Sequence, residues 1–275
     1  MSMAEDSKPE AKAFTPDWRI LVLLGLALAA AAFVFADLLE DMIEDPLIPL
    51  DALVYKTMQG LRTPALDTVM IAITELGDTV VVVSVAAIVA FWLTWRGAWR
   101  TLVYWLTAIA GASAINTAIK AALERPRPVE LYLQGASNWS FPSGHSTVNA
   151  VLYGCFAMII VRECHPSLRL PVMAAATVLI ILIGFSRLYL GAHWASDVFG
   201  GLVFAAMWLA LLSLFYMYRQ AEPVDARGLM IATASALIVA GGANIAFNHV
   251  EDTVKYRVRT ACGPAALAPL AQAAL

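Results

Sequence analysis

The chain has 275 residues, of which 60% are hydrophobic and only 14% are charged, and its formal net charge is −3. With a mean hydropathy of +0.72, this composition excludes an ordinary soluble globular domain. The basic residues are few and mostly stand at the ends of apolar stretches, so the sequence gives no support for a nucleic-acid partner.

Seven uncharged apolar stretches are each about as long as a bilayer is thick. They are residues 20–36, 79–95, 101–119, 146–161, 170–186, 198–218 and 228–248. A helix needs roughly 17–25 such residues to cross a membrane. The sequence therefore predicts an all-α fold, a polytopic membrane helical bundle with a six-span core and a further C-terminal apolar helix.

The first stretch resembles the apolar part of a signal peptide, because the alanine-rich steps near Phe33 to Ala36 resemble a cleavage site. A signal peptide begins with a positively charged segment, whereas here four acidic residues are mixed with three basic ones before residue 20. We therefore expect an uncleaved anchor. Cys155, Cys164 and Cys262 are an odd number at distant positions, so no disulfide framework is predicted.

The predicted organisation has three parts. Residues 1–19 form a cytoplasmic tail, residues 20–219 a membrane core with a periplasmic insert at about 37–78, and residues 220–275 an apolar helix and tail. Within the insert, apolar residues recur at helical spacing in two segments, and Thr63-Pro64 is typical of a helix start. These two amphipathic helices lie in the membrane interface or, alternatively, face solvent on top of the spans.

A first polar motif, KAALERPRP, runs from Lys120 to Pro128 at the end of the third stretch. Arginine binds two phosphate oxygens through its planar fork, and lysine adds a mobile positive charge. Lys120 and Arg127 thus form a candidate phosphate site, and the alternative is a pair of side chains that snorkel to the membrane edge. Glu124 and Arg125 either contact the rest of a headgroup or pair with Lys120 and solvent.

The second motif, Pro142-Ser143-Gly144-His145, opens the fourth stretch. The first turn of a helix offers unpaired N–H groups to an anion, and Gly144 lets a ligand approach the backbone closely. His145 could give a proton to a leaving oxygen. The plainer alternative is an N-cap serine followed by a capping histidine.

The third motif, SRLYLGAHWASD, spans Ser186 to Asp197. His193 and Asp197 are four residues apart and share a helical face, so the carboxylate can hold one ring nitrogen while the other attacks. Arg187 ends the fifth stretch and can reach the same phosphate. An interfacial His–Asp pair is the alternative, but alternating spans bring all three motifs to one membrane face.

With these residues in place, the chain resembles the type-2 phosphatidic acid phosphatase superfamily, whose signature is K-x6-R-P, P-S-G-H and S-R-x5-H-x3-D. The resemblance implies that His193 forms a phosphohistidine, Asp197 supports it and His145 protonates the leaving group. It also implies phosphate binding by Lys120, Arg127, Ser143, Gly144 and Arg187. No metal and no other cofactor are implied, and the sequence has no carboxylate cluster suited to magnesium.

Arginines in short loops predict the orientation, because such loops stay cytoplasmic. Three loops at residues 95–100, 162–169 and 219–227 each carry two arginines. The motifs then face the periplasm or exterior. The basic residues after Asn248 break this pattern, so either the rule fails there or the last stretch does not cross.

The expected function is a metal-independent membrane phosphatase that hydrolyses a lipid phosphate or pyrophosphate ester in the bacterial inner membrane. Undecaprenyl pyrophosphate, phosphatidylglycerophosphate, phosphatidic acid and a lipid A phosphate all fit such a site. Alternatives are a lipid-to-lipid phosphotransferase and, less favoured, a membrane transporter whose function needs intramembrane charges. The sequence does not indicate an oligomeric state.

Overall fold

The computed structural model describes residues 18–44, 48–128, 138–217 and 222–261. All regular structure in these residues is helical, which confirms the all-α prediction. The helices are α1 (Trp18–Glu44), α2 (Pro49–Gly60), α3 (Pro64–Glu75), α4 (Thr79–Trp95), α5 (Trp99–Leu123), α6 (Gly144–Glu163), α7 (Pro166–Tyr189), α8 (Ala195–Met217) and α9 (Ala226–Ala261).

Each predicted apolar stretch lies in its own long helix. Among the described residues, six helical segments are long and apolar enough to cross a membrane. They are α3 with α4 counted as one segment, α5, α6, α7, α8 and α9. The stretch at residues 20–36 lies in α1, and this helix continues to Glu44 through acidic residues that the sequence assigns to the insert. The C-terminal helix α9 spans 36 residues and also extends beyond its predicted stretch.

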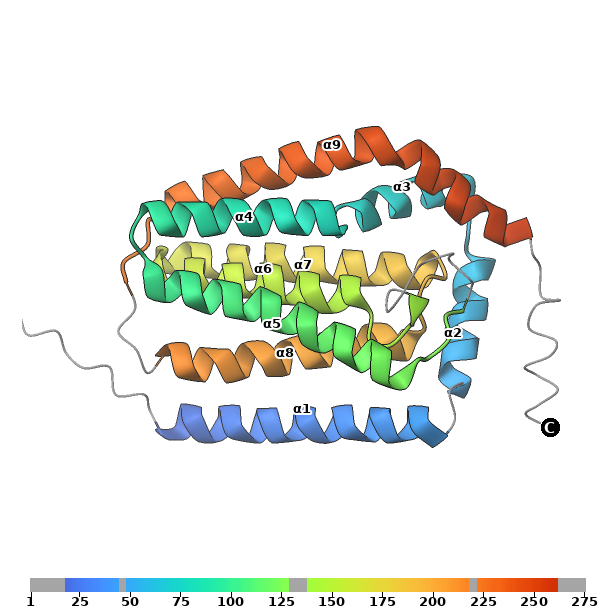
Figure 1. Ribbon diagram of the computed structural model, residues 1–275, viewed down its shortest axis with the longest axis horizontal. Coiled ribbons are helices and arrows are strands. Elements are labelled where there is room, and N and C mark those ends of the chain that lie inside the picture. Colours follow the sequence, from blue (N-terminus) through green and yellow to red (C-terminus); the bar gives the residue numbers. More distant parts are fainter. Residues whose placement is uncertain (1–17, 45–47, 129–137, 218–221, 262–275) are drawn as a thin grey trace, which may run out of the picture.

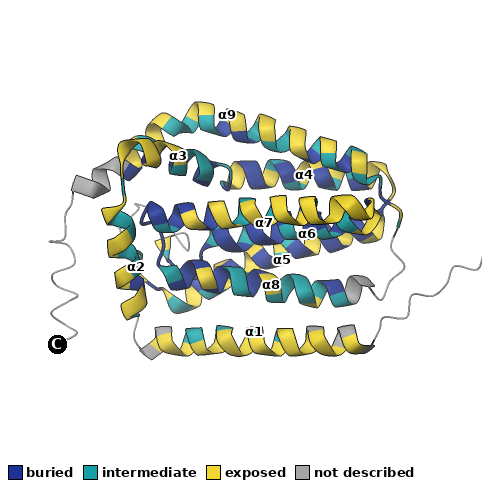
Figure 2. Ribbon diagram, turned by 180° about the vertical axis from the view of Figure 1, so that it is seen from behind, coloured by how far each residue is buried: buried dark blue, intermediate teal, exposed yellow. Residues whose placement is uncertain are grey.

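The long helices lie side by side, and α2 runs across one end of the bundle (Figure 1). Helix α6 is central and packs against α5, α7 and α8, whereas α9 packs along α4 and α3. The side chains of α6 are largely buried, whereas one face of α7 is exposed (Figure 2). An exposed apolar face on a membrane helix is suited to contact with lipid tails.

Local sequence explains several helix starts. Proline occupies the first turn of α2, α3 and α7, where its missing N–H has no helical partner to lose. Thr63 caps α3, since its hydroxyl accepts a hydrogen bond from the Leu66 N–H at 3.3 Å. The predicted helix start at Thr63-Pro64 is therefore confirmed.

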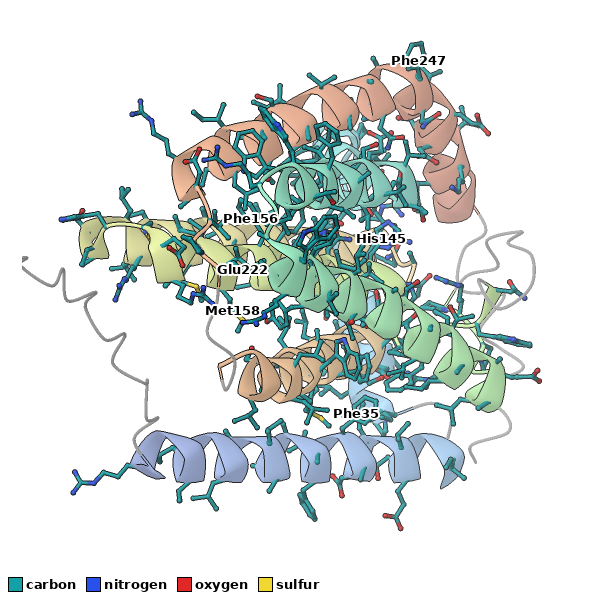
Figure 3. All side chains as sticks on the ribbon, turned by 60° about the vertical axis from the view of Figure 1, so that its left-hand side comes forward. Phe35, His145, Phe156, Met158, Glu222 and Phe247 are labelled. Carbon is teal, nitrogen blue, oxygen red and sulfur yellow. The ribbon has the colours of Figure 1, made fainter. Side chains whose placement is uncertain are left out.

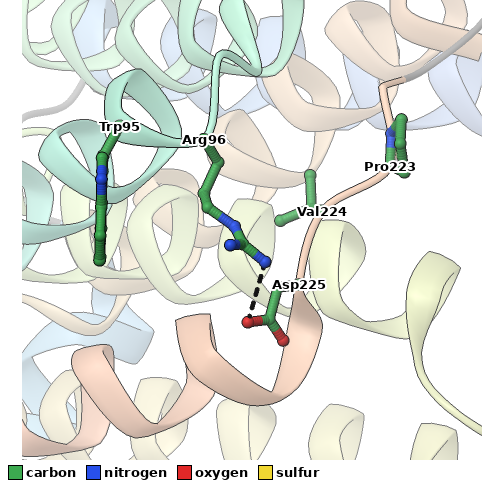
Figure 4. A pocket seen from close by; sticks show the side chains of 5 residues that line it. All are labelled: Trp95, Arg96, Pro223, Val224 and Asp225. Carbon is green, nitrogen blue, oxygen red and sulfur yellow. Dashed lines mark hydrogen bonds and ion pairs between the residues drawn. The ribbon is translucent and has the colours of Figure 1, made fainter.

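The end of the bundle that carries the arginine loops is held by polar contacts. Arg96 pairs with Asp225 at 3.2 Å (Figure 4). The Glu222 carboxylate accepts from the backbone N–H groups of Arg100 at 2.9 Å and Thr101 at 3.3 Å. These contacts join the α4–α5 loop to the segment that precedes α9, at the end opposite the three motifs.

Helices α6 and α8 approach each other closely beside the motifs. A Cβ atom built on Gly201 of α8 would lie 3.1 Å from the Ser143 carbonyl oxygen and 2.8 Å from Thr147 Oγ1. Small residues allow such close contact between membrane helices. The backbone N–H of Ser143 in turn donates to the Asp197 carbonyl at 3.0 Å, so the second and third motifs are joined directly.

Candidate active site

The three motifs meet at the end of the bundle where α2 lies. Lys120 belongs to the last turn of α5, His145 to the first turn of α6, and His193 to the short connection between α7 and α8. Figure 3 shows His145 in the interior of the bundle, whereas Phe247 on α9 points away from it. The predicted convergence of the motifs at one end is thus present in the fold.

His193 and Asp197 lie side by side as predicted, but they do not share a helical face, because His193 lies in the connection that precedes α8. The imidazole is 3% exposed and Asp197 is fully buried, and His193 Nδ1 lies 3.4 Å from Asp197 Oδ2. Arg127 Nη1 lies 3.0 Å from His193 Nε2. Because guanidinium only donates and carboxylate only accepts, Nε2 carries the lone pair and Nδ1 carries the hydrogen. The atom expected to attack phosphorus is therefore unprotonated and lies beside a cation.

Asp197 is held by more donors than the motif reveals. The backbone N–H of Trp194 donates to Oδ2 at 2.8 Å, the Ser140 hydroxyl donates to the same oxygen, and Arg125 Nη1 donates to Oδ1 at 2.6 Å. A buried carboxylate needs such partners, since an uncompensated charge is costly away from water. Ser140 was not among the predicted site residues.

Arg125 links this carboxylate to α2. Its second nitrogen, Nη2, lies 2.7 Å from Asp51 Oδ2, and both side chains are almost fully buried. Asp51 also accepts from the Ser196 N–H at 2.8 Å and from the Ser196 hydroxyl. Of the two roles that the sequence left open for Arg125, neither matches: the side chain pairs with Asp51 and Asp197, so it is a structural member of the site.

Lys120 and Arg127 both lie at the site, as predicted. Lys120 Nζ donates to the Ser140 carbonyl at 3.1 Å and also to that of Trp139. Arg127 donates to the carbonyl oxygens of Ala192 at 2.7 Å and Asn138 at 3.1 Å, in addition to His193. Both cations are thus oriented by backbone oxygens around the nucleophile.

Arg187 is buried beside α3 and α9. Its Nη1 donates to Thr74 Oγ1 at 2.7 Å and to the Tyr256 hydroxyl at 3.0 Å. Its Nε is buried and has no hydrogen-bond partner among the described residues. A charged group with an unused donor is well suited to bind an anion. This is consistent with phosphate binding by Arg187, which stays a prediction.

The start of α6 combines a cap with a possible anion site. Ser143 is the N-cap, because its hydroxyl accepts from the Ser146 N–H at 3.3 Å. The next amides, those of Gly144 and His145, belong to the first turn, where a helix cannot pair them. A Cβ at Gly144 would meet only Asn116 Oδ1, at 3.6 Å. Packing among the described residues therefore does not require glycine there, and close approach of a ligand to Gly144 stays a prediction.

His145 has a carboxylate partner outside the motifs. Its Nε2 lies 3.0 Å from Oδ1 of Asp78, the residue that precedes α4. Asp78 was not among the predicted site residues. Its only distinguishing feature in the sequence is an acidic side chain directly before an apolar stretch. The ring nitrogen Nδ1 of His145 is left for chemistry with a substrate.

Electrostatics at the nucleophile favour the neutral imidazole. Burial lowers the pKa of His193 well below its ordinary value, and the positive charges of Arg127, Lys120 and Arg187 lower this pKa further. Three cationic side chains from two of the motifs therefore act on one ring. Within the described residues, no group of three or more His, Cys, Asp or Glu side chains could hold a metal ion, and metal independence stays a prediction.

Comparison with known proteins gives one family. The profile of the PAP2 superfamily matches residues 101–221. Phosphatidylglycerophosphatase B of Bacillus subtilis is 34% identical over 159 residues, which cover 55% of this chain and 75% of that protein. In solved structures, a transmembrane PAP2-type phosphatidylglycerolphosphate phosphatase from Bacillus subtilis aligns with a TM-score of 0.63 and 29% identity, covering 70% of this chain and 98% of the other.

Two further relatives carry different substrate names. Lipid A 1-phosphatase of Rhizobium etli is 31% identical over 140 residues, covering 47% of this chain and 54% of that protein. Undecaprenyl-diphosphatase BcrC of Bacillus subtilis is 31% identical over 161 residues, covering 55% of this chain and 77% of that protein. The family resemblance read from the three motifs is confirmed, and the relatives are phosphatases of membrane lipids.

Proposed function

This chain belongs to the PAP2 superfamily as a membrane lipid phosphatase, and we propose that it removes phosphate through a phosphohistidine on His193. The observation that carries this proposal is the placement of the His193 ring. Its Nδ1 faces the buried Asp197 carboxylate at 3.4 Å, and its Nε2 faces Arg127 at 3.0 Å. A nucleophile with an orienting carboxylate and a cation at the attacking atom suits phosphoryl transfer.

In the first step, Arg127 exchanges its hydrogen bond to Nε2 for one to a phosphate oxygen, the freed Nε2 lone pair attacks phosphorus, and the bond from phosphorus to the lipid oxygen breaks. His145 gives its proton to that oxygen, so the lipid leaves as a neutral alcohol, or as a lipid phosphate when the substrate is a pyrophosphate. Arg127, Lys120 and Arg187 carry the charge on the transferring oxygens together with the N–H groups of Gly144 and His145. Asp197 stabilises the ring of His193 as it becomes cationic.

In the second step, water attacks the phosphohistidine and the nitrogen–phosphorus bond breaks. His145, now deprotonated, accepts the proton of that water, and inorganic phosphate is released. A general acid or base contributes about 10²–10⁴-fold to such steps, and one preorganised donor contributes about 3–4 kcal/mol. The residues at this site are therefore sufficient in number for the chemistry.

The proposed substrate is a phosphorylated lipid that the enzyme meets at the outer face of the inner membrane. The relatives named for phosphatidylglycerophosphate, lipid A and undecaprenyl diphosphate support this class. The arginine loops gathered at the opposite end of the bundle support a periplasmic site. Within this class, the rates of phosphate release by the purified protein from the different lipids identify the preferred substrate.

The test is phosphate release from a panel of these lipids by purified protein in detergent, with His193→Ala as the inactive control. Acid-labile label should appear on the wild type and be absent from His193→Ala, because the variant lacks the nucleophile. Full activity in His193→Ala would overturn the mechanism. Transfer of label to a second lipid, in place of phosphate release, would indicate a phosphotransferase.

A further inference from the structure

The junction between α3 and α4 is pressed against the first turn of α6. A Cβ built on Gly77 would lie 2.9 Å from Asn149 Nδ2 and 3.1 Å from His145 Cδ2. Asn149 Nδ2 donates to the Gly77 carbonyl at 3.0 Å and to the His145 carbonyl at 2.9 Å. Only glycine allows this approach, which brings the next residue, Asp78, to the ring of His145.

The two carboxylate oxygens of Asp78 have different partners. Oδ1 faces His145 Nε2 at 3.0 Å, and Oδ2 accepts from Asn244 Nδ2 at 3.0 Å. Because an ionised carboxylate only accepts, the hydrogen on His145 lies on Nε2. The remaining nitrogen, Nδ1, is thereby fixed as the one that exchanges a proton with a substrate oxygen.

The amide of Asn244 is itself held in one orientation. Nδ2 also donates to the Glu75 carbonyl at 3.0 Å, and Oδ1 accepts from Asn248 Nδ2 at 2.8 Å. Asn244 is 5% exposed. Turning the amide over would place its oxygen against a carbonyl and a carboxylate, which is unfavourable for a buried group.

Neither Asp78 nor Asn244 belongs to the motifs. Asp78 precedes the residues that match the family profile and Asn244, on α9, follows them. Most of the large apolar side chains on α9, Phe247 among them, are exposed (Figure 3). The buried asparagine is thus a polar contact that α9 makes with the machinery of the site.

We propose that α9 is a positioning element of the active site, with Asn244 fixing Asp78 and Asp78 fixing the proton-donating ring of His145. The proposal rests on the proposed function, in which His145 protonates the leaving oxygen. Asp78 and Asn244 are positioning residues, since neither is required to touch the substrate. Replacing either residue should lower kcat/KM for substrates whose leaving oxygen needs a proton, and should have little effect on substrates with a good leaving group.

The experiment compares two substrates in Asp78→Asn. The leaving group of a lipid phosphomonoester is a strongly basic alkoxide that needs the proton, whereas the leaving group of p-nitrophenyl phosphate is a stabilised phenolate. We expect kcat/KM to fall about 10²-fold on the lipid ester, within the range of general acid catalysis, and less than about tenfold on p-nitrophenyl phosphate. A merely structural defect would lower both rates by the same factor.

Asn244→Ala keeps the carboxylate and removes only its support, so it carries the test if Asp78→Asn does not fold. We expect about a tenfold loss on the lipid ester, which corresponds to one hydrogen bond to a charged group, and little change on p-nitrophenyl phosphate. The matched control is Asp225→Asn. Its carboxylate pairs with Arg96 across the same two helices at the opposite end of the bundle, and both rates should stay at the wild-type level.

The outcomes separate the two proposals. If wild type releases no phosphate from any lipid, the proposed function fails. If wild type is active and His193→Ala is inactive, but both variants lose the two activities equally or lose neither, the positioning role of α9 is overturned while the function stands. A selective loss on the lipid ester with an unaffected Asp225→Asn supports the proposal.

Discussion

Replacing Asp51 by asparagine should destabilise the protein and slow catalysis from outside the motifs. The carboxylate is 1% exposed and receives Arg125 Nη2 at 2.7 Å and the Ser196 N–H at 2.8 Å. Asparagine keeps the shape but removes the charge. Breaking a buried ion pair from one side costs about 3–5 kcal/mol. Since Arg125 keeps Asp197 as a partner, we expect the lower value, about 3 kcal/mol.

A loss of this size is measurable as a shift in thermal unfolding in detergent. For a chain of this length, 1 kcal/mol corresponds to about 2–4 °C, so Tm should fall by about 6–12 °C. Assayed well below its own Tm, Asp51→Asn should retain folded protein but show about a tenfold lower kcat, which is about 1.4 kcal/mol in the barrier. The reason is that Arg125 also holds Asp197, which orients His193.

Asp67→Asn is the matched control for this prediction. Asp67 is also buried and pairs with an arginine, receiving Arg62 Nη2 at 2.9 Å and Arg62 Nε at 3.0 Å. Within the part of the chain that the structure describes, Asp67 is not hydrogen-bonded to Asp197, so the variant should lose stability with kcat unchanged. Equal kcat losses in the two variants, or an unchanged Tm in Asp51→Asn, would refute the reasoning.

Three further predictions concern the chemistry and the orientation. Activity should survive EDTA and be inhibited by orthovanadate, which can bond to His193 in a five-coordinate geometry; a strict magnesium requirement of the chemical step would contradict this. Because the pKa of His193 is lowered by burial and by nearby cations, the ring stays neutral on acidification to about pH 6.5. The kcat profile should therefore have no acidic midpoint above that pH. In a chain without native cysteines, Lys56→Cys should react with an impermeant thiol reagent in intact cells and Ser167→Cys only after lysis, and the reverse pattern would move the site to the cytoplasmic face.

Much of the fold follows from local sequence, because helices in a bilayer must be apolar over a fixed length. The stretch at residues 79–95 coincides with α4. The ends of α1 and α9 are less predictable, since both helices continue through charged residues beyond the hydrocarbon length. A polar residue that lies past the span can stay helical when tertiary contacts or neighbouring turns support it.

The candidate site is predictable only in part. Fixed spacing identifies His193, Asp197 and His145, since each motif is contiguous in sequence. The contacts of Arg125 with Asp51 and of Asp78 with Asn244 join residues 74 and 166 positions apart. No periodicity carries such pairings, because they depend on which helices become neighbours. The sequence therefore indicates the reacting groups, and the fold adds those that hold them.

The contact at Gly201 gives the bundle interior a direct effect on reactivity. A Cβ at position 201 would lie 2.8 Å from Thr147 Oγ1 and only 3.1 Å from the Ser143 carbonyl oxygen, a backbone atom that cannot rotate aside. Relief would require α8 to slide or tilt away from α6, and the anion-binding turn would then separate from the nucleophile. A single methyl group on this face of α8 would thus change the distance between the first turn of α6 and the ring of His193.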